Sequence, residues 1–94
     1  MHTFKGATPT TNASRIMRRL CKHWSHKYPV QVDDTNGVIE LPNVRCTLQA
    51  SADRLDITLE GAEAVPERLK GVVAEHLQRM AGDETLAVHW DAAA

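Results

Sequence analysis

Hydrophobic and polar positions alternate with two different periods along this chain. Between residues 30 and 60, apolar residues occupy every second position in four short runs that are separated by turn-forming residues. This period predicts β-strands with one apolar and one polar face, and the short connections favour a four-strand antiparallel meander. The segment Asp34-Thr35-Asn36-Gly37 is expected to form the first hairpin turn, because Asn-Gly readily adopts positive φ angles.

Helical periodicity flanks this meander on both sides. Residues 12–27, stepped at about 100° per residue, gather apolar side chains on one face and basic side chains on the other, as in an amphipathic helix. Residues 65–81 predict a second helix, with Pro66 in its first turn and Gly82 as its stop. The apolar positions are Ile16, Met17, Leu20, Cys21 and Trp24 in the first helix, and Leu69, Val72, Val73, Leu77 and Met80 in the second.

The two ends of the chain carry shorter strand patterns. Residues 2–9 are a possible strand, and residues 85–91 alternate as a final strand that either edge of the sheet can accept, with a frayed tail from Asp91 onward. The predicted order is therefore (β)αββββαβ. Residues 1–94 form a single α+β domain, in which an antiparallel β-sheet has two amphipathic helices packed on one face.

Charge is unevenly distributed, although the net charge is only −1. Residues 1–32 contain lysines and arginines but no acid, so the first helix has a basic outer face formed by Arg15, Arg18, Arg19 and Lys22. Such a face suits phosphates, an acidic protein or an anionic membrane surface, or it is simply solvated or paired with the chain's own acids. Nucleic acid is disfavoured, because the polar sheet face is acidic and lacks aromatic side chains.

The densest group of reactive side chains lies at the end of the first helix, in the run from Cys21 to Lys27. His23 and His26 are i,i+3 neighbours that could share a ligand, and His76 could face His23 across the helix–helix contact. These three histidines are candidate metal ligands, with Cys21 as a further ligand-binding candidate, although two ligands do not fill a tetrahedral site. The alternative is structural: Cys21 in the core, His23 beside it, His26 in solvent and His76 a hydrogen-bonded core histidine.

Three segments resemble a bacterial family catalogued as domain of unknown function 2218. The resemblance rests on Leu20-Cys21-Lys22-His23-Trp24-Ser25-His26-Lys27 after Ser14-Arg15, on Val72 through Ala81, and on Val88-His89-Trp90. Ile16 and Met80 stand where the family pattern favours an aromatic residue and Phe. The resemblance implies a bacterial, stand-alone domain, and it brings no established activity, cofactor or catalytic residue.

Three functions are compatible with these features. The first is a cytoplasmic, non-enzymatic accessory domain that binds a metal ion or small anion at the helix–helix edge. The second is an interaction module that uses the basic helix face to bind an acidic protein or to form a homodimer. The third, and least favoured, is an enzyme that uses Cys21 or His23. The two cysteines form no disulfide framework, and no apolar stretch reaches the ~18 residues of a membrane span.

Overall fold

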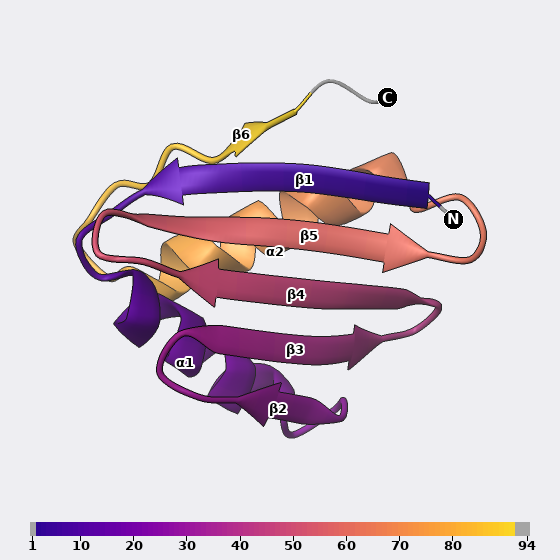
Figure 1. Cartoon of the computed structure of the whole chain (residues 1–94), viewed down its shortest axis with the longest axis horizontal. Helices are drawn as coiled ribbons and strands as arrows, with labels where there is room; N and C mark the ends of the chain where they lie inside the picture. The colour runs from indigo at the N-terminus through magenta and orange to yellow at the C-terminus, as the bar shows by residue number, and fades with distance from the viewer. Residues whose placement is uncertain (1, 92–94) are drawn as a thin grey trace.

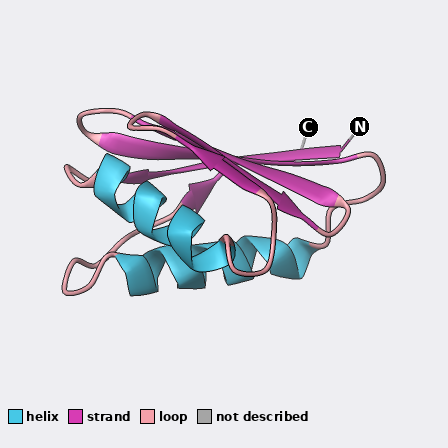
Figure 2. Cartoon of the chain, turned by 90° about the horizontal axis from the view of Figure 1, so that it is seen from below, coloured by secondary structure: helices cyan, strands magenta, loops and turns pink. Residues whose placement is uncertain are grey.

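A six-stranded antiparallel sheet with both helices on one face forms the architecture of the chain (Figures 1 and 2). The computed structural model describes residues 2–91, so the tail expected beyond Asp91 lies outside the described residues. The α+β class, the order βαββββαβ and the one-sided helical cover are confirmed. The elements are β1 (His2–Pro9), α1 (Ala13–Trp24), β2 (Val30–Val32), β3 (Asn36–Leu41), β4 (Val44–Ala50), β5 (Arg54–Gly61), α2 (Glu67–Met80) and β6 (His89–Trp90).

The strand order across the sheet is β2-β3-β4-β5-β1-β6. The meander from β2 to β5 is continuous, and β1 pairs with β5 along its whole length, from His2 opposite Gly61 to Pro9 opposite Arg54. The final strand joins the free edge of β1 (Figure 1). In this pairing Trp90 lies opposite Gly6. The sequence did not indicate which edge of the sheet the final strand joins. In the structure it pairs with β1.

The core lies between the apolar sheet face and the two helices. Every second residue of the central strands is buried, and α1 buries its apolar face completely against them, which makes burial of large aliphatic side chains, at about 1.5–3 kcal/mol each, the main stabilising term. By contrast, α2 fully buries only Val73 and Leu77 within its helical span. The predicted alternation fails at the sheet edge, where Val32 of β2 keeps 45% of its surface exposed.

The helices are shorter than predicted. The first ends at Trp24, three residues early, because the backbone N–H groups of Lys27 and Tyr28 both donate to the Trp24 carbonyl and turn the chain toward Pro29. Pro66 lies just before α2 instead of in its first turn, since its ψ of 132° is extended. Gly82 follows α2 with a φ of +66°, as expected for a glycine stop signal.

The first hairpin turn differs from its prediction. Asn36 and Gly37 already belong to β3, and Gly37 does not adopt a positive φ. Asp33 forms the turn instead, because its Oδ1 accepts the backbone N–H groups of Thr35 (2.9 Å) and Asn36 (2.8 Å). Gly37 is needed for another reason: a Cβ there would lie 2.8 Å from the Sγ of Cys21. The glycine therefore permits close approach of α1 to the sheet.

The final strand is also shorter than residues 85–91. The side chain of Gln78, in α2, forms hydrogen bonds with the backbone just before β6. Its Nε2 donates to the Glu84 carbonyl at 2.7 Å, and its Oε1 accepts the Leu86 N–H at 2.8 Å. These groups are consequently unavailable for strand pairing. Trp90 then lies over Gly6, so closely that a Cβ on Gly6 would be 2.6 Å from the indole.

Candidate functional site

Two histidines from different helices meet at the helix–helix edge. The ring centroids of His23, from the end of α1, and His76, from α2, are 5.9 Å apart. His76 also packs against the indole of Trp24 at 5.0 Å. Its Nδ1 lies 2.7 Å from the Val72 carbonyl, and since a carbonyl only accepts, this nitrogen carries the proton. The Nε2 atom of His76 is thereby left for another partner.

The placement of His76 follows from how α2 rotates on the sheet. Val73 and Leu77 point to the core, whereas Leu69, Val72 and His76 fall within about 60° of one another on the adjoining side at 100° per residue. Val72, predicted as part of the buried stripe, is therefore 38% exposed, and His76 is half-buried. This side of α2 faces the end of α1 and forms one wall of a pocket.

The pocket has a volume of about 510 Å³. The turn after α1 contributes Lys27 and Tyr28, the latter packed edge-on against Trp24 with centroids 6.3 Å apart. The lining combines four basic side chains with aromatic and aliphatic ones, and these described residues include no Asp or Glu. It consists of His23, Trp24, Lys27, Tyr28, Leu41, Pro42, Val44, Pro66, Arg68, Leu69, Val72 and His76.

The positive charge of this pocket is not neutralised within residues 2–91. Neither Lys27 nor Arg68 forms a salt bridge with an acid in this part of the chain, whereas cations elsewhere do. On the open sheet face, for example, Arg45 contacts Glu40 at 2.7 Å, beside another concavity that also contains Glu60. The helix–helix pocket is therefore the concavity with the clearest excess of donors and cations.

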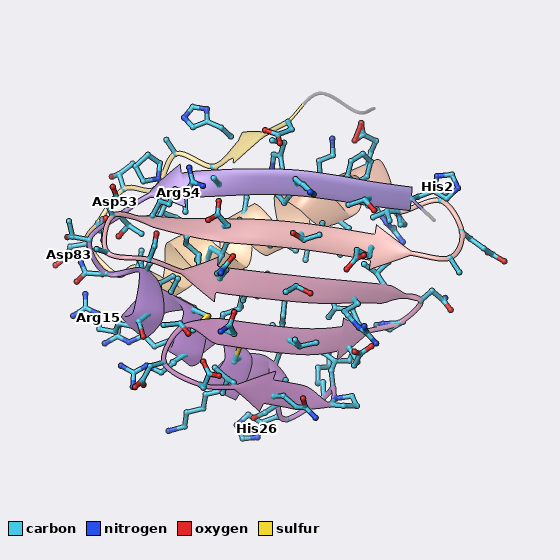
Figure 3. The ribbon with its side chains drawn as sticks, in the orientation of Figure 1. His2, Arg15, His26, Asp53, Arg54 and Asp83 are labelled. Carbon is cyan, nitrogen blue, oxygen red and sulfur yellow. The ribbon has the colours of Figure 1, made fainter. Side chains whose placement is uncertain are left out.

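Two predicted site residues do not join the pocket. His26 lies beyond the last residue of α1, is exposed and does not line the pocket; in Figure 3 it projects from the β2 side of the molecule. Cys21 is fully buried, and desolvation raises its pKa to about 11. Burial, together with the nearby Cys21, raises the pKa of Cys46 to about 12. Both thiols are therefore protonated at neutral pH, which makes them poor ligands and nucleophiles.

Among the described residues, no further metal-ligand side chain joins the two histidines. Within residues 2–91, no three or more His, Cys, Asp or Glu side chains are arranged to hold a metal ion. The histidine pair therefore lacks a third protein ligand there, and the pocket that it lines also contains Lys27 and Arg68.

The basic face of α1 is partly engaged by the chain itself. Arg18 lies 3.7 Å from Asp34, and Arg19 donates to the Met80 carbonyl at 3.2 Å, where it complements the C-terminal end of α2. Side-chain hydrogen bonds from Thr10 and Asn12, just before α1, lower the pKa of Glu84, and the charge of Arg15 adds to this. The remaining side chain, Lys22, is exposed.

Sequence reasoning missed Arg68 and Tyr28 as lining residues and did not assign Lys27 a role in the site. One signal was available for Arg68, because Arg68, Val72 and His76 are spaced at i, i+4 and i+8 and so follow one side of a helix. No helix between residues 2 and 91 combines the length and apolar character that crossing a membrane requires.

The fold and the pocket define a small α+β domain with one-sided helical cover and a concave site between its helices. Residues 5–91 match the family described as "Uncharacterized protein conserved in bacteria (DUF2218)", and the chain belongs to this family, as its motifs indicated. It is similar to the protein in the NMR structure of PA4090 from Pseudomonas aeruginosa, with 35% identity over 99% of this chain and 98% of the other, and a TM-score of 0.80. No curated protein matches the chain.

Proposed function

We propose that this protein is a cytoplasmic binding domain that holds a small anion at the helix–helix edge. One observation supports this function above the others: His23, Lys27, Arg68 and His76 line a single pocket that contains no carboxylate. Clefts lined by charge of one sign concentrate ligands of the opposite sign, and arginine and imidazolium donors form strong, charge-assisted hydrogen bonds with oxyanions. The two free, buried thiols suit a reducing compartment.

A small anion fits this pocket better than a metal ion does. A bound cation would meet only two imidazoles and would be repelled by Lys27 and Arg68. An anion would instead be attracted by Lys27 and Arg68, and it would accept hydrogen bonds from the imidazoles. Because the Nδ1 of His76 donates to the Val72 carbonyl, His76 donates to an anion through Nε2 in its imidazolium form.

The other two hypotheses receive less support. Arg18 and Arg19, from the centre of the basic face, already contact Asp34 and the end of α2, which reduces the charge available to a partner protein. A catalytic role through Cys21 is disfavoured, because this thiol is fully buried and burial raises its pKa to about 11.

The proposal is tested by titrating inorganic phosphate into the protein while the imidazole and indole resonances are followed by NMR. We expect saturable shifts of His23, His76 and Trp24. Arg68→Gln should weaken binding roughly three- to tenfold, because a charge-assisted hydrogen bond at a partly exposed site contributes about 1 kcal/mol. The matched control Lys22→Gln removes one positive charge from α1 outside the pocket and should change little.

Two results would contradict anion binding. The first is a phosphate response that is non-saturable, or that is equal in the Arg68→Gln and Lys22→Gln variants. The second is a saturable shift of the His23 and His76 rings with Zn(II) or Ni(II) but not with phosphate, which would establish a metal site instead.

A further inference from the structure

We infer that the anion bound in this pocket is an aryl carboxylate, with a planar aromatic body of about the size of two fused rings. This inference rests on the proposed function and adds the chemistry of the rest of the ligand. A pocket of about 510 Å³ falls in the range that encloses small organic ligands, and it is larger than a bare inorganic anion needs.

Most of the pocket wall is apolar. Leu41, Pro42 and Val44, at the turn between β3 and β4, contribute from the sheet, and Leu69 and Val72 contribute from α2. Leu41 and Val44 are already buried in the core, but a phosphate or acetate ion would leave the accessible surface of Pro42, Leu69 and Val72 in contact with water. An apolar ligand body would cover them, and such burial contributes binding free energy in proportion to the area removed from water.

Val72 is the clearest sign of an apolar ligand body. It and Val32 are the two large hydrophobic side chains that remain exposed in the described residues, at 38% and 45%. Val32 lies on the edge strand β2 and does not line the pocket, whereas Val72 faces the same space as the cationic side chains. An exposed apolar residue beside converging cations is the arrangement that an amphipathic anion requires.

The aromatic side chains favour a ring over an alkyl chain. Trp24 packs against His76 with an interplanar angle of 45° and against Tyr28 at 82°, and all three rings belong to the pocket lining. Aromatic rings gain from such edge-to-face contacts beyond the area they bury. The carboxylate is assigned to the side of Arg68, whose planar guanidinium can donate two parallel hydrogen bonds to it.

The test is isothermal titration calorimetry of the intact protein with four probes. These are 1-naphthoate, acetate, octanoate and the uncharged 1-naphthalenemethanol. We expect 1-naphthoate to bind at least about tenfold more tightly than each of the others, because it alone combines the charge with the aromatic body. Raising the salt concentration should weaken the binding of 1-naphthoate and acetate but not that of 1-naphthalenemethanol.

Two exposed valines provide a matched pair of variants. Val72→Asn should weaken 1-naphthoate binding about fivefold or more, and clearly more than acetate binding, because it removes apolar contact without removing charge. Val32→Asn makes the same exchange at the β2 edge and should have no effect on either probe. Both side chains are exposed, so both variants are expected to fold.

Each contrary outcome has a separate meaning. Acetate binding as tight as 1-naphthoate binding overturns the aryl inference and leaves the anion site intact. Equal binding of octanoate and 1-naphthoate overturns the aromatic preference. If 1-naphthoate and 1-naphthalenemethanol bind equally and Arg68→Gln alters neither, the proposed anion function itself fails. An effect of Val32→Asn as large as that of Val72→Asn would place the ligand elsewhere.

Discussion

Gly37→Ala tests whether close packing, and not turn geometry, requires glycine at the start of β3. The added Cβ would lie 2.8 Å from the Sγ of Cys21 and 3.4 Å from the Cγ of Met17. Both neighbours are fully buried, so neither can withdraw into solvent. Gly37 has no positive φ, and alanine can therefore adopt its backbone conformation without strain.

The size of the effect follows from two opposing contributions. Overpacking a well-filled core costs about 1–3 kcal/mol, while replacing glycine in a compatible conformation recovers about 0.4–1 kcal/mol through the unfolded state. We expect a net loss of about 1–2 kcal/mol in the free energy of unfolding. At about 4–8 °C per kcal/mol for a domain of this size, Tm should fall by roughly 4–16 °C.

The assay is a double-mutant cycle with Cys21→Ala, measured by urea denaturation. Removing the Sγ atom leaves room for the new methyl group, so the two substitutions together should cost at least about 1 kcal/mol less than their sum. A coupling below about 0.3 kcal/mol, with Gly37→Ala equally harmful in both backgrounds, would refute the packing argument and indicate backbone strain. A fully neutral Gly37→Ala would refute the close approach itself.

Three further predictions concern other parts of the fold. Because burial raises the pKa of Cys21 to about 11 and of Cys46 to about 12, a thiol reagent at pH 8 should label the native protein only as fast as it opens; rapid labelling without urea would disprove this. Gly6→Val should displace the indole of Trp90 from β1, and unchanged Trp90 indole shifts in NMR spectra would contradict the contact. Side-chain hydrogen bonds from Thr10 and Asn12, just before α1, lower the pKa of Glu84, so its charge stabilises the fold above the ordinary glutamate pKa, and this stability is lost as the pH falls through the lowered value. Glu84→Gln should flatten that part of the pH–stability profile, and an unaltered acid limb would contradict it.

The fold could be predicted because its elements follow local periodicities. A period of two specifies which face of each strand enters the core, and a period of 3.6 does the same for the helices. The errors arise where a tertiary contact decides. In the sequence, Gly37 is compatible with a turn residue and equally with a residue that permits close packing. Only the contact with Cys21 distinguishes these two roles. Val72 belongs to an apolar stripe whose rotation on the sheet is not encoded within the helix.

The candidate site could be predicted only in part. The sequence indicated that His23 could face His76, and the structure places their rings 5.9 Å apart. His26 was predicted to join them on the assumption that the helix continues past Trp24. The helix ends at Trp24, and the backbone turns away there. Helical spacing could have placed Arg68 on the same side of α2 as His76. The residues of the turn between β3 and β4 could not be assigned, because a pocket formed by a turn of the sheet and two helices has no signature within any one of them.

The most direct test of the central claim is the location of a bound aryl carboxylate. Intermolecular NOEs between the ring protons of 1-naphthoate and assigned protein protons report contacts within about 5 Å. The account predicts NOEs to the Val72 methyl groups and to the rings of Trp24 and Tyr28, and it predicts that Arg68→Gln weakens them. NOEs to the open sheet face or to the exposed methylenes of Lys22, with none to Val72, would contradict a binding site at the helix–helix edge.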